Sequence, residues 1–124
     1  RSRRYANPLS CISVRASDTP HADIAEIGRT LKGQLRWVDL LGEWRDDVLL
    51  VVLPETDGEA ADALAHKLAQ AVATSLPALQ ARLTIGNALW LRGDNAEQLV
   101  ERALHNGAPV VGSLRALNPP RIPR

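Results

Sequence analysis

Two short apolar runs on either side of a polar segment constrain this chain more than any other feature. Val38 to Leu41 and Val48 to Leu53 flank the sequence Gly-Glu-Trp-Arg-Asp-Asp, which is polar and suited to a turn. Runs of this length, rich in Val and Leu, are typical of strands, and two of them across a short polar segment predict a β-hairpin. The fold must therefore contain antiparallel strands, and other elements must cover their apolar side.

Further strands and helices are predicted around this hairpin. Short β-branched runs predict strands at Leu9 to Val14, Leu83 to Leu91 and Val110 to Val111. Apolar residues spaced three or four apart predict three helices, with the stripes Ile24, Ile27, Leu31 and Leu35; Ala61, Leu64, Leu68 and Val72; and Leu99, Val100, Ala103 and Leu104. The order β-α-β-β-α-β-α-β favours an α+β sandwich with a ferredoxin-like core, in which helices flank a mostly antiparallel sheet.

Local signals set the expected ends of these elements. The sequence from Thr56 to Glu59 has the S/T-x-x-E spacing of a helix N-terminus, and Asp94 to Glu97 repeats it. Pro77 should end the long helix, because proline lacks an amide hydrogen. Gly86 and its neighbour Asn87 interrupt a strand, which predicts a bulge or a close approach of another backbone.

Composition bounds the kind of protein. A length of 124 residues suits one domain, and a net charge of +1 indicates no particular partner. The single cysteine, Cys11, cannot form an internal disulfide, which favours a reducing compartment. No apolar run reaches the roughly 18 residues that span a bilayer. We therefore expect a cytoplasmic protein, or the cytoplasmic part of a membrane protein.

Several kinds of site lack support in the sequence. No P-loop, dinucleotide-binding glycine motif or hydrolase elbow is present, and the few aromatic residues argue against a nucleic-acid polymer as partner. The three histidines, His21, His66 and His105, fall on separate expected elements without an acid or thiol at ligand spacing. Cys11 lies in an expected buried strand as a small hydrophobe. We nominate no catalytic residue, no metal ligand and no cofactor.

One pair of charged residues has two possible roles. Arg36 and Asp39 place a guanidinium and a carboxylate three residues apart, where the first helix gives way to the hairpin. As a surface salt bridge the pair would contribute about 0–1 kcal/mol. Alternatively, the guanidinium would donate to guanine O6 and N7 while the carboxylate accepts from the N1–H and N2–H edge.

The chain resembles the GGDEF domain of bacterial diguanylate cyclases from Arg4 to about Val111. Arg4 to Ser10 is similar to the R-Y-x-x-P-L-S entry to the first strand of that family. Arg36 to Pro54 follows its R-x-x-D, five residues, G-G-D-E-F, strand and L-P pattern, while Leu53 to Asp57 and Thr84 to Ala88 resemble its L-P-x-T-D and S-I-G-x-A segments. The resemblance implies the GGDEF fold over residues 1–113, followed by a Pro- and Arg-containing tail at 114–124.

Departures from the family pattern imply that the domain is degenerate and catalytically inactive. The G-G-D-E-F positions read Arg45-Asp46-Asp47-Val48-Leu49, so Val48 stands where the family has a metal-binding, catalytic acid. Arg15 aligns with the first-strand aspartate that holds Mg²⁺, and a cation there repels the metal. The guanine-reading loop is shortened to residues 15–20, and the terminal A-K-x-x-G-R-N segment has no lysine in the neighbourhood of His105 to Gly107.

The product-inhibition motif of the family is retained. By the resemblance, Arg36 and Asp39 bind cyclic di-GMP, and Lys67, thirteen positions after Pro54, adds the basic residue that completes the site. Trp37 flanks the motif, as does Trp44, and either indole would offer a stacking surface to a base, with core or dimer packing as the alternative. Glu43 stands where the family often has another arginine, so its carboxylate would oppose an anionic ligand.

These resemblances predict a cyclic di-GMP receptor. The ligand would bind as a monomer or an intercalated dimer, a homodimer is a further expected assembly, and the messenger would be reported to a neighbouring sensor or output domain. Biofilm, motility and exopolysaccharide control are the processes that the family suggests. The alternatives are a ligand-free structural or dimerisation module of a signalling protein, and a domain that binds GTP without turnover.

Overall fold

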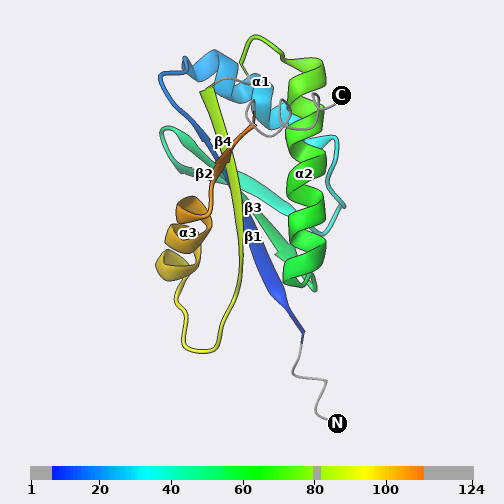
Figure 1. The fold of residues 1–124 in the computed structure, drawn as a ribbon, viewed down its shortest axis with the longest axis vertical. Helices are drawn as coiled ribbons and strands as arrows, with labels where there is room; N and C mark the ends of the chain where they lie inside the picture. The colour runs from blue at the N-terminus through cyan, green and yellow to red at the C-terminus, as the bar shows by residue number, and fades with distance from the viewer. Residues whose placement is uncertain (1–6, 80–81, 111–124) are drawn as a thin grey trace, which may run out of the picture.

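The computed structural model describes residues 7–79 and 82–110 and has the predicted order of elements (Figure 1). The elements are β1 (Leu9–Ala16), α1 (His21–Lys32), β2 (Leu40–Arg45), β3 (Val48–Pro54), α2 (Gly58–Ser75), β4 (Leu83–Leu89), α3 (Ala96–His105) and β5 (Ala108–Pro109). None of the helices in these two stretches is long and apolar enough to cross a bilayer.

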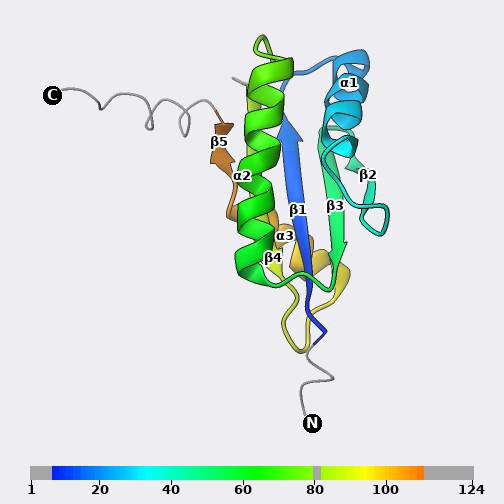
Figure 2. The same cartoon turned by 90° about the vertical axis from the view of Figure 1, so that its right-hand side faces the viewer.

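The five strands form one antiparallel sheet in the order β2-β3-β1-β4-β5. Helices α1 and α2 cover one face and α3 covers the other, as Figure 2 shows with α1 and α2 in front of the sheet and α3 behind it. The predicted α+β sandwich with a ferredoxin-like core is confirmed.

Strand β1 is buried on both faces because it lies in the middle of the sheet. Ile12 and Val14 point into the larger core under α1 and α2, whereas Cys11 packs with Leu99 and Ala103 of α3 in a smaller core. Burying a Val, Leu or Ile side chain contributes about 1.5–3 kcal/mol, so these two layers hold the helices on the sheet. Burial also raises the pKa of the Cys11 thiol to about 11, consistent with a cysteine that packs as a small hydrophobe.

The predicted hairpin is confirmed, but its strands and turn are shifted. Val38 lies in a turn, and the strand β2 begins at Leu40 and continues through Glu43 and Trp44, residues that we had placed in the connecting turn. Only Asp46 and Asp47 connect β2 to β3. The prediction followed apolarity, but β2 is an edge strand with mostly exposed residues, so its composition does not mark it.

Both predicted helix caps move by one residue. The N-cap of α2 is Asp57, whose carboxylate accepts from the backbone N–H of Ala60 at 2.9 Å, and not Thr56. Helix α3 begins after Asn95, which forms a capping box with Gln98 in place of the expected Asp94 and Glu97. In each case the expected cap bonds elsewhere: Thr56 with Pro54 and Arg36, and Asp94 with Leu91 and Arg102.

The last strand also lies earlier than predicted. β5 is Ala108–Pro109, and Val110, the first residue of the predicted strand, is buried just after it. Three predicted features lie outside the described residues: Val111, residues 4–6 of the opening motif, and the tail at 114–124. Leu35 packs against the larger core from beyond the end of α1.

Gly86 allows α3 to approach the sheet closely. A Cβ at this position would lie 2.2 Å from the carbonyl oxygen of Ala103 and 2.6 Å from the backbone nitrogen of Gly107. The pairing of β1 with β4 continues without interruption through Gly86, so the predicted close approach is confirmed and no bulge forms there.

Gly86→Ala should therefore destabilise the fold by about 1–3 kcal/mol, because rigid backbone atoms must move to admit the methyl group. Urea unfolding measures this change. Gly42→Ala is the matched control, since nothing lies within 4 Å of a Cβ there, and its effect should stay within about 0.5 kcal/mol. Equal stability of the two variants would contradict the close packing of α3.

Candidate functional site

Arg36 and Asp39 meet in a tight turn between α1 and β2. The backbone N–H of Asp39 donates to the carbonyl oxygen of Arg36 at 3.0 Å, and the backbone N–H of Arg36 donates to Asp39 Oδ2 at 2.8 Å. Aspartate favours such turns because its side chain accepts from nearby backbone amides. Three positions of spacing are thus enough to bring the two side chains together, as the sequence suggested.

The two side chains form an ion pair that is buried on the acid side. Arg36 Nη2 donates to Asp39 Oδ1 at 2.8 Å, and Nε lies 3.2 and 3.3 Å from the two carboxylate oxygens. The Asp39 side chain is only 1% exposed, whereas that of Arg36 is 52% exposed. The hydrogen bonds to Asp39 raise the pKa of Arg36, so the guanidinium stays charged.

Arg36 also connects this turn to the start of α2. Its Nη2 donates to the carbonyl oxygen of Pro54 and to Thr56 Oγ1, each at 3.0 Å, and the Thr56 hydroxyl donates to the same Pro54 oxygen at 2.9 Å. Glu55, between these two residues, has a positive φ of 51°, which is unfavourable for a side chain other than glycine. Arg36 therefore bonds both neighbours of a strained residue.

Thr56 extends the connection to β1. The backbone N–H of Thr56 donates to Pro8 O at 3.1 Å, and the buried Ser10 hydroxyl donates to Thr56 O at 2.7 Å. We call Arg36, Asp39, Pro54, Thr56 and Ser10 the arginine clamp. Sequence reasoning missed Thr56 and Ser10, although the L-P-x-T-D and P-L-S segments that contain them were noted for their resemblance.

The outer side of the arginine clamp is open to solvent. Among the described residues, Arg36 Nη1 has no hydrogen-bond partner, so its two N–H donors are not committed to the protein, and the Arg36 side chain is 52% exposed. Trp37, next in the turn, is 94% exposed. An indole this exposed is unusual, because removing its large apolar surface from water is favourable. The turn thus presents a cation and an aromatic face together.

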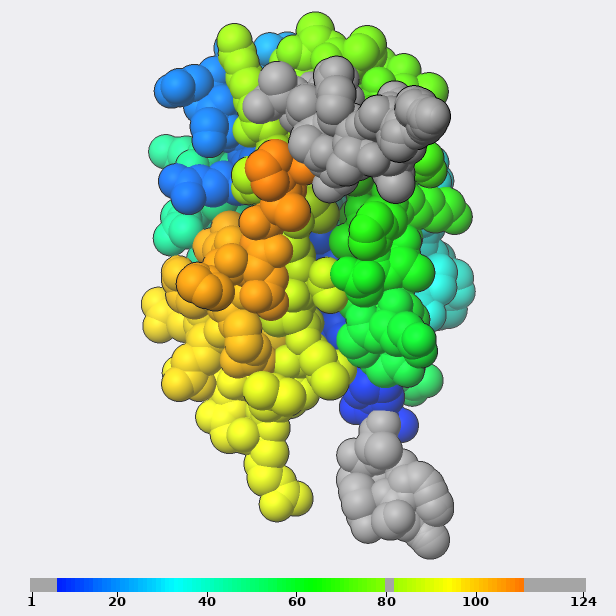
Figure 3. Space-filling model, in the orientation of Figure 1, coloured from blue at the N-terminus to red at the C-terminus, as the bar shows by residue number. Residues whose placement is uncertain are grey.

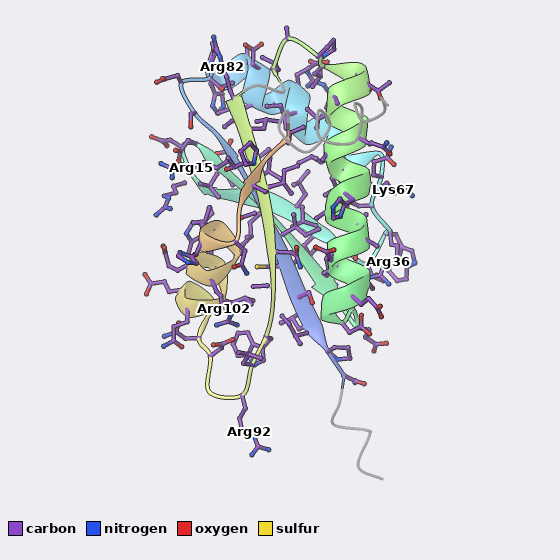
Figure 4. The ribbon with its side chains drawn as sticks, in the orientation of Figure 1. Arg15, Arg36, Lys67, Arg82, Arg92 and Arg102 are labelled. Atoms are coloured by element: carbon purple, nitrogen blue, oxygen red, sulfur yellow. The ribbon has the colours of Figure 1, made fainter. Side chains whose placement is uncertain are left out.

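Lys67 and Trp44 stand in different relations to this turn. Figure 4 shows Lys67 on α2 and Arg36 on the same side of the molecule, away from α3 in this view. Within the described stretches, Lys67 forms no hydrogen bond or ion pair, so its ammonium is not committed to another residue. Trp44 lies toward the other end of β2, roughly 16 Å along the strand from Asp39 at about 3.3 Å per residue. The structure therefore does not bring Trp44 beside Arg36.

The hairpin end of the sheet contains Arg15, Asp47 and Val48, which the sequence analysis aligned with the G-G-D-E-F segment and the first-strand aspartate. Val48 is 1% exposed and pairs with Arg15 across β1 and β3, and Arg15 Nε donates to Asp47 Oδ2 at 3.1 Å. The carboxylate of Asp47 is thus engaged by Arg15. No group of three or more His, Cys, Asp or Glu that could hold a metal ion is found within residues 7–79 and 82–110.

A hollow of about 370 Å³ lies beside this hairpin, between it and the start of α1. Its lining residues are Thr19, His21, Ile24, Glu43 and Asp46. The two carboxylates give the hollow an acidic rim, which disfavours a triphosphate by like-charge repulsion. Glu43 lines this hollow, which agrees with the case in which its carboxylate points away from the Arg36 turn and does not oppose an anion there.

A second hollow, of about 410 Å³, separates α2 from β4 and β5. Figure 3 shows it between the green surface of α2 and the yellow and orange surface of β4, α3 and β5. Asp62, His66, Gln70, Asn87 and Asn106 supply its polar lining, and Lys67 also borders it. Asn106 Nδ2 donates to Asn87 O at 3.0 Å, so these two lining residues are bonded to each other. Sequence analysis gave no signal for this hollow, because its residues come from α2, β4, β5 and the turn after α3.

No protein-family model and no curated protein matches this sequence. Solved structures do match its fold. The diguanylate cyclase SiaD of Pseudomonas aeruginosa, solved in complex with its activator SiaC, superposes with a TM-score of 0.66 at 22% identity over 94% of this chain and 50% of that chain. The chain thus spans about half the length of SiaD.

Two further neighbours carry the same fold. The active GGEEF domain of a diguanylate cyclase from Vibrio cholerae has a TM-score of 0.65 at 18% identity, over 93% of this chain and 82% of that chain. PelD from Pseudomonas aeruginosa PAO1, solved in complex with c-di-GMP, has a TM-score of 0.59 at 22% identity, over 81% of this chain and 37% of that chain. The fold is that of GGDEF cyclase domains.

Thr56→Val should destabilise the protein by about 1 kcal/mol, because the substitution removes a nearly buried hydroxyl that bonds both Arg36 and Pro54. Thermal or urea unfolding measures the change. Thr74→Val, at an exposed position of α2, is the control and should change stability by less than about 0.5 kcal/mol. A Thr56 variant as stable as the control would show that the clamp does not hold α2.

Proposed function

We propose that this chain is a cyclic di-GMP-binding domain without diguanylate cyclase activity, and that the ligand binds at the turn formed by Arg36 and Asp39. The observation that supports this proposal best is the half-exposed Arg36 side chain, anchored by a buried carboxylate and with the two donors of Nη1 not committed to the described part of the chain. A fixed, desolvated anchor with a free donor side is what recognition of a guanine edge or a phosphate requires.

The chemistry of the ligand suits the groups near this turn. Cyclic di-GMP carries two phosphates and two guanines, so its binding needs cations and donors to O6 and N7. Arg36 provides both, and Lys67 on α2 adds a point charge directed to a phosphate. An intercalated ligand dimer would extend toward a second protomer, and a receptor of this kind would report the ligand to a neighbouring sensor or output domain.

The residues at the hairpin support the absence of cyclase activity. Phosphoryl transfer by two-metal enzymes needs carboxylates that hold Mg²⁺ beside the triphosphate. Here Arg15 engages Asp47, Val48 is buried, and the adjacent hollow has an acidic rim without Lys or Arg in its lining. Arg15 opposes a metal ion at Asp47, and the carboxylates of the rim oppose a triphosphate.

A structural role for the same motif is the second candidate. The bonds of Arg36 to Pro54 and Thr56 give it a part in the fold without any ligand. A ligand-free module would need only these bonds, whereas a receptor also uses the open side of the guanidinium. Ligand titration separates the two.

Calorimetry with cyclic di-GMP should show saturable binding to the wild-type chain and none to Arg36→Ala, because both the donors and the positive charge are lost. Arg92→Ala is the matched control: Figure 4 shows Arg92 at the lower tip of the molecule, in the loop between β4 and α3 and apart from Arg36 in this view, and this variant should bind as the wild type does. No binding by the wild type, or undiminished binding by Arg36→Ala, would reject the proposal.

Lys67→Arg should tighten binding and Lys67→Ala should weaken it, each by roughly 3- to 10-fold, because a planar guanidinium adds a second donor to a phosphate and alanine removes the charge. The same titration measures both variants. Unchanged affinity in both would remove Lys67 from the site and leave Arg36 in it.

Incubation with GTP and Mg²⁺ should yield no cyclic di-GMP above the level of a protein-free control. Chromatographic detection of the product measures this directly. Turnover by the wild-type chain would overturn the interpretation of Arg15 and Val48.

A further inference from the structure

Strand β3 is apolar on both of its faces. Every residue from Val48 to Leu53 is Val or Leu, and the alternate residues Leu49, Val51 and Leu53 lie in the larger core under α1 and α2. A strand without polar residues on either side is typical of a sheet that is covered on both faces. The residues of β3 that point away from α1 and α2 should therefore be covered as well.

The register of the sheet shows which residues lie on this second face. Val52 pairs with Leu40 of β2 and with Cys11 of β1, and Cys11 packs under α3. Side chains at paired positions point to the same face of a sheet, so Leu40 and Val52 lie on the face that carries α3. Leu50, two residues before Val52, shares that face. We call Leu40, Leu50 and Val52 the open strip.

Helix α3 leaves the open strip exposed. In the described part of the chain α3 packs mainly on β1 and β4, whereas two helices, α1 and α2, cover the opposite face (Figure 2). Leu40 is 63% exposed, and Leu50 and Val52 are partly exposed. Gly42 pairs with Leu50, and a Cβ at Gly42 would meet nothing within 4 Å. Space therefore remains on this face beside α3.

This space has the dimensions of one helix. Neighbouring strands lie about 4.8 Å apart, so β2 and β3 together are roughly 10 Å wide, close to the 8–10 Å between the axes of packed helices. The strand β3 spans roughly 20 Å from Val48 to Pro54 at about 3.3 Å per residue, the length of about 13 helical residues. A helix of three to four turns would complete the layer that α3 begins.

Two arginines border the open strip at its hairpin end. Val48 pairs with Arg45 on one side and with Arg15 on the other, so both side chains start from one row of the same face. Figure 4 shows Arg15 on the side of the molecule where α3 lies. Arg15 Nε lies 3.1 Å from Asp47 Oδ2 and Arg45 Nη1 lies 3.8 Å from Glu101 Oε2, and the two arginine side chains are 53% and 49% exposed. Exposed ion pairs contribute about 0–1 kcal/mol, so both guanidinium groups can bind further carboxylates.

We propose that the open strip is a docking site for an amphipathic helix of a partner protein. The apolar stripe of that helix lies on Leu40, Leu50 and Val52, and its acidic residues lie at the end beside Arg15 and Arg45. Docking then buries the second face of β3 as α3 buries that of β1, the mode in which an amphipathic helix presents its apolar side to an apolar surface. The inference is independent of cyclic di-GMP, because none of these residues belongs to the arginine clamp.

A synthetic 18-residue peptide with a leucine stripe and three glutamates at one end tests the proposal. Titration of the full chain followed by NMR should shift the methyl resonances of Leu40, Leu50 and Val52 and leave those of Leu91 fixed. A matched peptide with three lysines in place of the glutamates should bind at least about 5-fold more weakly, because its charges repel the two arginines. Arg45→Glu should reduce or reverse this preference.

Substitutions in the open strip test the apolar contact. Leu40→Asp should weaken binding of the glutamate peptide by at least about 10-fold, because it places a carboxylate where an apolar surface is buried. Gly42→Asp should act alike and has no packing to lose, since a Cβ there meets no other atom. Leu91→Asp changes an exposed leucine beyond the end of β4 and is the control, which should bind as the wild type does.

Two outcomes would overturn the proposal. One is the absence of binding by the wild type, or binding that both Leu40→Asp and Gly42→Asp leave unchanged. The other is a doubling of the mass of the chain in light scattering that Leu40→Asp abolishes, because a second copy of the chain would then occupy the open strip.

Discussion

The ion pair between Arg36 and the buried Asp39 is the interaction on which the candidate site depends. It closes the turn between α1 and β2, and through Nη2 it reaches the end of β3 and the start of α2. Thr56 then bonds Ser10, so one guanidinium links four parts of the fold. Since Asp39 fixes the guanidinium from the inside, the outward donors are held in place before any ligand arrives, which lowers the cost of binding.

The turn of Arg36 and the hairpin differ in which charges are engaged within the fold. At the turn Arg36 is paired with Asp39 and its side chain is 52% exposed, whereas at the hairpin the carboxylates of Glu43 and Asp46 rim a hollow and Arg15 is bonded to Asp47. A fold shared with cyclases therefore does not imply their chemistry here, because chemistry depends on the groups at the site.

The sequence predicted the order of the elements and the residues of the larger core, since hydrophobic periodicity is strong in β1, α1 and α2. It placed β2 too early, because an exposed edge strand carries no apolar run to mark it. Both helix caps were displaced by one residue, since Thr56 and Asp94 fit the capping pattern but have partners elsewhere in the fold. Such competition between local and distant partners cannot be seen in a local pattern.

The candidate site was predictable only in part, because a local sequence pattern shows contacts between near neighbours and not those between distant residues. The spacing of Arg36 and Asp39 is local and predicts their contact, but it does not predict that the Asp39 side chain is only 1% exposed. The bonds of Arg36 to Pro54 and Thr56, and the separation of Glu43 and Trp44 from this turn, likewise follow from how the strands pair. The resemblance to GGDEF domains located the motif, and the structure defines which of its atoms face solvent.

Side-chain NMR during titration with cyclic di-GMP tests the central claim most directly. The account predicts that the Arg36 Nε–H and Trp37 indole N–H resonances move and saturate together. The corresponding resonances of Trp90 and of Arg102, an α3 residue bonded to Asp94, should stay fixed. Resonances that all remain fixed, or that move only at the hairpin around Arg15, would contradict it.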